Sequence, residues 1–159
     1  MKTRRHISKE EALGKMQAIA SKSEKCESDI LTRLNKTNLG DEDKNWIIAS
    51  LKEDKFIDDE RFTYFYVKDK LNISKWGRKK IAYALKFKNI DQNIIESALN
   101  SIDRDEYLNS LRKLLKVKNK SLKADNIYSK KGKLFRFAAQ KGYEASLIND
   151  IINEIFDKK

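Results

Sequence analysis

The chain has 159 residues and a net charge of +11, with no proline, five glycines, one histidine and one cysteine. The scarcity of turn residues argues against an all-β fold, and one cysteine with one histidine supplies neither a disulfide nor a zinc tetrad. No apolar run approaches a membrane span and the basic N-terminus lacks a signal peptide's apolar stretch, so we expect a cytoplasmic protein with no membrane partner.

Apolar residues recur with helical spacing along nearly the whole chain, and no segment alternates apolar and polar residues for long. Ser8, with Glu11 three residues later, forms a capping box that begins the first long helix. A second long helix begins at Asp58 or Asp59, and a third begins at Asp103. Shorter periodic segments lie between them, near residues 30–34, 47–51, 81–85, 94–99, 134–138 and 147–155. The sequence therefore predicts an all-α fold.

The ends of three short segments share a pattern that indicates an internal repeat. Asn38, Asn89 and Gly142 each follow an amphipathic stretch, and Asn and Gly tolerate the left-handed backbone that closes a helix in a Schellman motif. These positions are 51 and 53 residues apart. We therefore predict three tandem three-helix units in an elongated, curved array, rather than one bundle with coincidental caps. The predicted bounds are 1–55, including a basic N-terminal tail, 56–102 and 103–159.

The charge is segregated along the chain. Residues 41–60 contain eight acidic and three basic side chains, whereas 68–88 contain eight basic and one acidic, and 112–141 contain eleven basic and one acidic. Separate blocks of one sign favour surfaces with separate partners, and a basic block favours nucleic acid. The alternative is a lysine-rich composition that charges every solvated helix face. Within the last block, residues 116–133 are weakly periodic and are expected to form an extended basic loop or a solvated helix extension.

Basic side chains crowd the start of the middle helix of the second unit, where exposed backbone N–H groups would complete a phosphate site. Other basic residues hold the corresponding place in the third unit. The candidate residues for contact with DNA or a DNA-bearing filament are Lys75, Trp76, Arg78, Lys79, Lys80, Lys130, Lys131, Lys133 and Arg136. Trp76 either stacks on a base or packs between repeats, and packing is the commoner role. Trp46 is expected in the core.

The sequence contains no recognisable catalytic arrangement. It has no glycine-rich loop of the P-loop or dinucleotide type, and His6 with Cys26 makes a poor nucleophile–base pair. The acidic run at 58–60 fits helix capping better than acid–base chemistry. We expect a binding protein with no catalytic residue, cofactor or metal, with Cys26 semi-buried near a helix N-terminus.

Each predicted unit carries a distinctive motif. Phe56-Ile57-Asp58-Asp59-Glu60-Arg61-Phe62 opens the second unit, which continues with Gly77-x-x-Lys80-Ile81-x-x-x-Leu85-x-x-Lys88-Asn89-Ile90. The third unit has Lys133-Leu134-x-Arg136-Phe137 with Lys141-Gly142-Tyr143, and the first has Asp29-Ile30-x-x-Arg33-Leu34 after Cys26. These motifs resemble those of the RecX family of bacterial recombination regulators; the first is the family's hallmark stretch, and the resemblance covers nearly the whole chain. The sequence departs from the family's pattern at Asn89, where the family usually has Gly, and at Cys26, where it commonly has Ser. Motif residues expected to be structural are Phe56, Asp58, Asp59, Arg61, Phe62, Gly77, Ile81, Leu85 and Gly142.

The resemblance implies a protein that modulates, usually by inhibition, the RecA recombinase. Such a protein lies in the groove of the RecA–single-stranded DNA filament, restrains ATP hydrolysis and strand exchange, and promotes disassembly. The partners it implies are the RecA filament, single-stranded DNA and, in some members, double-stranded DNA, and we expect a monomer. Two alternatives stay open: a stand-alone helical DNA-binding module without a RecA partner, and a protein-interaction scaffold whose charge is compositional.

Overall fold

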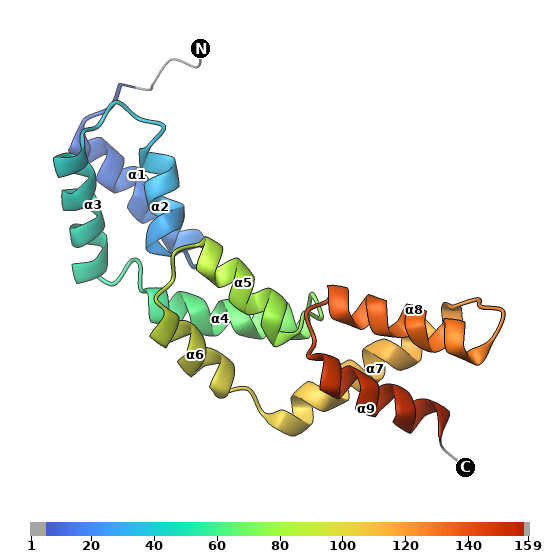
Figure 1. Ribbon diagram of the computed structural model, residues 1–159. Coiled ribbons are helices and arrows are strands. Elements are labelled where there is room, and N and C mark those ends of the chain that lie inside the picture. Colours follow the sequence, from blue (N-terminus) through green and yellow to red (C-terminus); the bar gives the residue numbers. More distant parts are fainter. Residues whose placement is uncertain (1–5, 158–159) are drawn as a thin grey trace.

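The computed structural model describes residues 6–157, and these form nine α-helices with no β-strand (Figure 1). Most of the basic N-terminal tail predicted from the sequence, residues 1–5, lies outside the described residues. The helices are α1 (Lys9–Lys22), α2 (Glu27–Leu34), α3 (Asp41–Glu53), α4 (Asp59–Asn72), α5 (Arg78–Phe87), α6 (Gln92–Asn100), α7 (Arg104–Ser121), α8 (Ile127–Gln140) and α9 (Ala145–Phe156).

The helices pack as three successive groups of three, here unit 1 (α1–α3), unit 2 (α4–α6) and unit 3 (α7–α9), each around its own apolar core. Side chains at the centres of these cores are Ile30, Leu34 and Ile47 in unit 1, Ile81, Leu85 and Ile95 in unit 2, and Leu111, Leu134 and Ile148 in unit 3. The units follow one another along an arc, with the chain ends at its two extremities (Figure 1). This arrangement confirms the predicted all-α, elongated and curved array of three-helix repeats.

The middle helix of each unit lies on the inner side of the arc, so that α2, α5 and α8 follow one another along its concave edge (Figure 1). The last helices, α3, α6 and α9, lie towards the outer edge. We call the solvent-facing sides of α2, α5 and α8 the inner face. It spans all three units and can therefore meet an extended partner.

The three predicted long-helix starts are confirmed by their caps. The Ser8 side chain accepts a hydrogen bond from the Glu11 amide at 3.2 Å. Asp58 caps α4, and the Asp103 carboxylate accepts from the Glu106 amide at 2.9 Å at the start of α7. A side-chain acceptor satisfies an amide that the helix itself leaves unpaired, which is why these residue types begin helices.

Two of the three predicted Schellman closures are present, and the third is wrong. Asn89 and Gly142 have φ values of 59° and 97°, and Ile90 N donates to Leu85 O at 3.2 Å, as Tyr143 N does to Ala138 O at 3.3 Å. Asn38 is not left-handed, because α2 has already ended in a turn. Its side-chain oxygen instead accepts from the Ile7 amide at 2.7 Å and ties down the chain before α1.

The basic segment at 116–133 is mostly helical. Of the two predicted alternatives, the extended loop is wrong, and the helix extension is correct for residues 116–121. α7 continues to Ser121 and α8 begins at Ile127, which leaves a short connection of residues 122–126. Leu122 packs against the unit 3 core and Asn126 caps α8 by accepting from the Ser129 amide at 2.8 Å. These two contacts fix both ends of the connection between α7 and α8.

Trp46 is not a core residue, contrary to the sequence prediction. It lies on α3 with 40% of its surface exposed, because Ile47, Ile48 and Leu51 already fill the core side of this helix. The Lys9 ammonium lies 4.7 Å from the centre of its indole ring, which shields the apolar surface.

Candidate nucleic-acid interface

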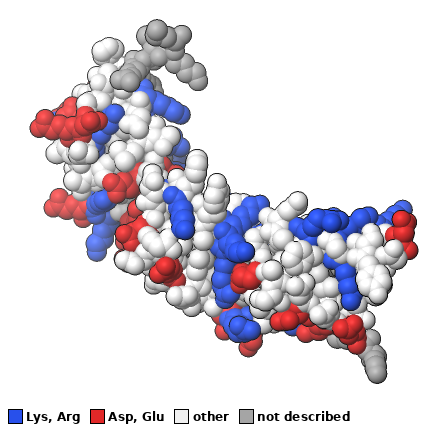
Figure 2. Space-filling view, viewed as in Figure 1, with Lys and Arg blue, Asp and Glu red and all other residues white. Residues whose placement is uncertain are grey.

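Basic side chains gather along the inner face, over α8 and where α5 approaches α8, whereas acidic side chains gather over α3 on unit 1 (Figure 2). Neither α5 nor α8 contains an acidic residue. Two helices that follow one another along the concave edge therefore carry four basic side chains each and no acidic one, while α7 carries further basic residues together with two acidic ones. A surface of this kind attracts polyanions, whether nucleic acid or an acidic protein surface, and repels basic proteins.

Four of the predicted contact residues, Lys130, Lys131, Lys133 and Arg136, lie together on α8. Lys133 and Arg136 are exposed, because Leu134 and Ala138 occupy the core side of the helix. The sequence predicted that these cations crowd the start of the helix, as those of α5 do. α8 instead begins at Ile127, so Lys131, Lys133 and Arg136 lie beyond its first turn. The cations therefore line the side of α8.

The backbone amides at the start of α5 are already paired with unit 3. Gly77 N donates to Lys141 O at 2.7 Å, and Lys79 N donates to Gly142 O at 3.0 Å. Arg78 N donates to the Tyr107 hydroxyl at 3.0 Å. These three amides are therefore already occupied and are not free for the phosphate site predicted from the sequence. What remains available at this place is the exposed side chain of Lys79.

Arg78 is held in the junction between units 2 and 3. Its Nη1 lies 3.0 Å from Glu144 Oε2, and its guanidinium stands 4.1 Å from the ring centre of Tyr107. The Tyr107 hydroxyl donates to the other oxygen of Glu144. Burial, followed by this hydrogen bond to Glu144, raises the pKa of Tyr107. With its charge already paired, Arg78 stabilises the junction and has little left to offer a phosphate.

Gly77 and Gly142 let the two backbones meet at this junction. A Cβ atom added to Gly77 would lie 2.4 Å from Gly142 C and O, and one added to Gly142 would lie 2.4 Å from the Cβ of Lys80. Gly142 also has a φ of 97°, which disfavours a side chain. Both motif glycines are therefore structural.

Trp76 packs within the array. Its half-buried indole lies against the unit 2 core, and the ammonium groups of Lys70 and Lys80 each stand 4.6 Å from the ring centre. The packing interpretation agrees with this environment. Lys75, just before it, has a φ of 59° and an exposed side chain at the turn that leads into α5.

The Asp-Asp-x-Arg-Phe motif joins unit 1 to unit 2. Asp59 Oδ1 accepts from the Glu27 amide at 2.9 Å and so caps α2 from the neighbouring unit. Arg61 Nε lies 2.8 Å from Glu24 Oε1, while its Nη atoms donate to the carbonyls of Lys55 and Phe56. Sequence reasoning placed these residues in a structural role but did not show that they cross a junction.

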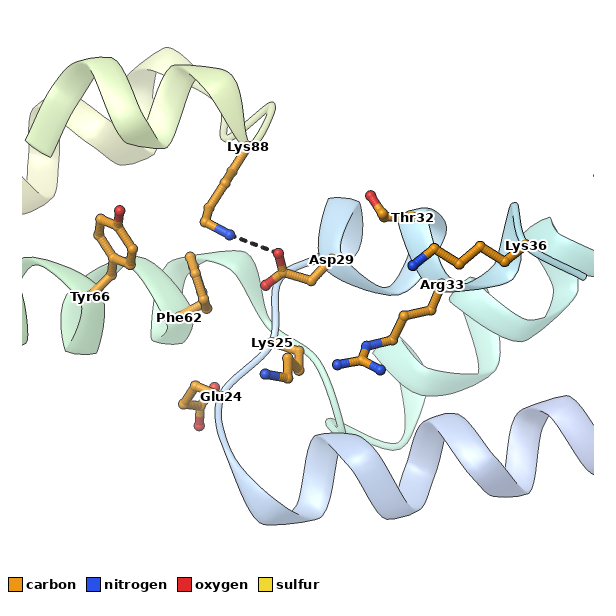
Figure 3. A pocket seen from close by; sticks show the side chains of 9 residues that line it. All are labelled: Glu24, Lys25, Asp29, Thr32, Arg33, Lys36, Phe62, Tyr66 and Lys88. Atoms are coloured by element: carbon orange, nitrogen blue, oxygen red, sulfur yellow. Dashed lines mark hydrogen bonds and ion pairs between the residues drawn. The ribbon is translucent and has the colours of Figure 1, made fainter. Parts of the chain in front are cut away.

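A cleft of about 450 Å³ opens beside this junction, between α2 on one side and α4 and α5 on the other (Figure 3). Lys88 extends from α5 and places its Nζ 2.8 Å from Asp29 Oδ1 on α2. Burial alone would raise the pKa of Asp29, but the hydrogen bonds from Lys88 and from the Cys26 amide outweigh it and lower that pKa. The residues around the cleft are Glu24, Lys25, Asp29, Thr32, Arg33, Lys36, Phe62, Tyr66 and Lys88.

The cleft carries an excess of positive charge that sequence reasoning missed. Glu27 and Asp29 made unit 1 look like a poor anion binder, yet Lys52 and Lys88 pair with these two carboxylates. Within residues 6–157, Lys25, Arg33 and Lys36 take part in no ion pair. The spacing of Arg33, on α2, and Lys36, just after its end, could have indicated a basic stripe, but the partners that neutralise the carboxylates come from distant residues.

Cys26 caps α2 and is fully buried, so it is more enclosed than the semi-buried position expected from the sequence. Burial is the largest cause of the raised pKa of its thiol.

Among residues 6–157 no three histidine, cysteine or carboxylate side chains are grouped to hold a metal ion. In the same part of the chain, no helix is long and apolar enough to cross a bilayer.

Three-helix repeats stacked along an arc define this chain as an all-α helical-repeat protein. Two family models match the chain: the second three-helix domain of RecX at residues 58–99 and the third three-helix domain of RecX at residues 105–152. Together they match more than half of the sequence.

Similar proteins carry the same family name. The "Regulatory protein RecX" of Clostridium botulinum (strain Eklund 17B / Type B) is 34% identical over 132 residues, which cover 82% of this chain and 61% of that protein. The protein of the same name from Clostridium tetani is 34% identical over 139 residues, covering 84% and 62%. The chain therefore spans about three fifths of the length of these curated relatives.

Solved structures agree on the fold. A crystal structure of regulatory protein RecX superposes with a TM-score of 0.81 at 22% identity, covering 90% of this chain and 70% of that chain. RecX from Lactobacillus salivarius gives a TM-score of 0.78 at 24% identity, covering 91% and 96%. The chain belongs to the RecX family.

Proposed function

We propose that this protein binds the RecA–single-stranded DNA filament and modulates RecA, in the inhibitory direction, by restraining ATP hydrolysis, strand exchange and filament growth. Membership of a family whose curated members are named regulatory proteins supports a regulator rather than an enzyme. The protein acts as a monomer in the cytoplasm, where its partners are the RecA filament and single-stranded DNA, and without a membrane or cofactor.

The observation that carries the proposal is the continuous inner face, on which basic helices of two units lie along one concave edge (Figure 2). A ligand of a helical nucleoprotein filament needs length, curvature and repeated phosphate contacts, and each unit adds one helix to such a contact. The exposed cations of α8, Lys133 and Arg136, then contact DNA phosphates or acidic surface of the filament.

The test measures RecA ATP turnover and filament binding on single-stranded DNA across a salt series, with the double variant Lys133→Gln/Arg136→Gln. The matched control is Lys113→Gln/Lys116→Gln, which removes two exposed charges from α7. We expect the α8 variant to weaken filament binding and relieve inhibition more than the control. An unmodified protein that leaves ATP turnover unchanged and shows no preference for the filament would refute the proposal.

The second candidate function is a stand-alone DNA-binding protein without a RecA partner, which the unpaired cations of α2 and α8 also favour. It predicts equal affinity for naked DNA and for the filament, and no effect on RecA. Parallel titrations of naked single strands, duplex and filament separate the two functions. A charge that is only compositional predicts binding that does not depend on salt.

A further inference from the structure

Two large aromatic side chains on α5 stand almost fully in solvent. Tyr83 is 74% exposed and Phe87 is 83% exposed, one helical turn apart on the side opposite the buried Ile81 and Leu85. Apolar surface left in water contributes no burial free energy to the fold, so core packing does not account for an aromatic pair in this place. Exposed apolar groups that the core does not need mark an interaction surface when they lie together.

Within residues 6–157, three other exposed aromatic residues, Trp46, Tyr64 and Phe65, each contact a cation or another ring, and Tyr83 and Phe87 do not. Tyr128 on α8 is also open, at 83% exposed, but it has no aromatic residue one helical turn before or after it. Lys9 lies over Trp46, and Lys68 lies 4.6 Å from the ring centre of Tyr64. Among the described residues, neither Tyr83 nor Phe87 contacts a cation or another ring. Their faces are therefore open to a ligand.

The surroundings of this aromatic pair are positive. Lys79 lies one turn before Tyr83, and Lys86 adjoins Phe87; both are exposed. Beyond the end of α5, the cleft towards α2 adds Arg33 and Lys36, whose charges no carboxylate in residues 6–157 neutralises. A ligand that fits this face offers flat apolar rings and regularly spaced negative charges.

A single strand of nucleic acid has that chemistry. Every unpaired base presents a ring face that stacks on an aromatic side chain, and every nucleotide carries a phosphate for a lysine or arginine. A duplex hides its base faces within the stack. Side chains four residues apart are about 6 Å apart along the helix axis, farther than the about 3.4 Å between bases of a B-form strand, so the pair suits bases that are drawn apart.

We propose that the exposed side of α5 is a base-stacking platform for single-stranded nucleic acid. Tyr83 and Phe87 stack on unpaired bases, and Lys79 and Lys86 bind the phosphates beside them. The platform deepens the proposed function, on which it rests, by naming which unit holds the bases and by which contact. It also gives units 2 and 3 different tasks, since α8 contributes cations without the paired aromatic faces.

The test uses naked strands without RecA. Fluorescence anisotropy measures the binding of a labelled thymidine oligonucleotide and of an abasic strand of equal length to the full chain and to Tyr83→Ala/Phe87→Ala. Because stacking contributes about 1–3 kcal/mol per base, we expect the double variant to bind the thymidine strand at least about tenfold more weakly. Its affinity for the abasic strand stays unchanged, since the phosphates and cations are intact.

Three control variants test the interpretation. Tyr64→Ala/Phe65→Ala removes two other exposed aromatic rings, from α4, and leaves both affinities unchanged. Lys79→Gln/Lys86→Gln weakens binding to both strands alike and flattens the salt dependence. Tyr83→Leu keeps apolar bulk at the position but removes the ring, so it weakens binding to the thymidine strand only. Circular dichroism verifies the helix content of each variant.

Equal weakening on both strands, or none, overturns the platform. Loss of filament binding by the Tyr83/Phe87 variant with unchanged binding to naked strands also overturns it, and assigns this face to a protein contact; the proposed function then stands. The reverse result is also informative. If the aromatic pair stacks on naked strands but the unmodified protein has no effect on RecA, the platform stands and the proposed function is refuted.

Discussion

Replacing Gly77 with alanine tests how units 2 and 3 are joined. The new Cβ would lie 2.4 Å from main-chain atoms of Gly142, and backbone atoms cannot rotate away as a flexible side chain can. The backbone segments around Gly77 and Gly142 must therefore move apart. Separation removes the hydrogen bonds from Gly77 N to Lys141 O and from Lys79 N to Gly142 O.

The magnitude follows from what the junction loses. Two main-chain hydrogen bonds contribute about 1 kcal/mol each, and displacement of Arg78 from the half-exposed carboxylate of Glu144 adds about 1 kcal/mol at most. Alanine restricts the unfolded chain and returns up to about 1 kcal/mol. We expect Gly77→Ala to lower the free energy of unfolding by about 1–3 kcal/mol.

The assay is urea unfolding followed by circular dichroism, combined with hydrogen exchange of the amides that cross the junction. The matched control is Gly132→Ala in α8, where an added Cβ meets nothing within 4 Å; it should stabilise the protein by about 0.5–1 kcal/mol through helix propensity. Equal stability of Gly77→Ala and the unmodified protein, with unchanged protection of Lys79 N, would refute the close-approach reasoning.

Three further predictions concern the junctions. Tyr143→Phe should raise the free energy of unfolding by about 1 kcal/mol, measured by urea unfolding, because the buried Tyr143 hydroxyl has no hydrogen-bond partner among the described residues. Burial raises the pKa of Tyr143 to about 12, so the folded state keeps a proton that the unfolded chain loses near pH 10; stability should fall from pH 10 to 12, and less so in Tyr143→Phe. Asp59→Ala should cost about 1–2 kcal/mol by leaving the Glu27 amide unpaired, whereas Asp59→Asn keeps an acceptor and should cost less.

The helix starts and two of the repeat closures could be predicted because they depend on local chemistry. A side-chain acceptor before an apolar stretch, or an Asn or Gly after one, acts within a few residues of itself, as Ser8 and Asn89 do. Asn38 fails this rule since its side chain pairs with a residue 31 positions away. No local pattern contains that partner.

The candidate interface was only partly predictable for the same reason. Charge blocks in the sequence located the basic helices, but which cations are free depends on distant carboxylates. Arg78 is paired by Glu144, 66 residues on, while Lys88 holds Asp29, 59 residues back, and so leaves the cations at and beside α2 without that carboxylate. The sequence alone shows that Tyr83 and Phe87 are four residues apart, on the side of the helix opposite the core residues. It does not show that they are exposed, because another unit could have covered that side.

The two junctions differ in kind, and the difference bears on how the inner face meets a partner. Units 2 and 3 meet through main-chain hydrogen bonds and two glycines, so the spacing between α5 and α8 is set by backbone contact. Units 1 and 2 meet through side chains, chiefly Asp59 and Arg61, beside an open cleft. Long side chains adjust to small shifts that a backbone contact forbids. In the proposed function, phosphate contacts that need a fixed register therefore belong on α5 and α8, while α2 has the freedom to follow the proposed partner.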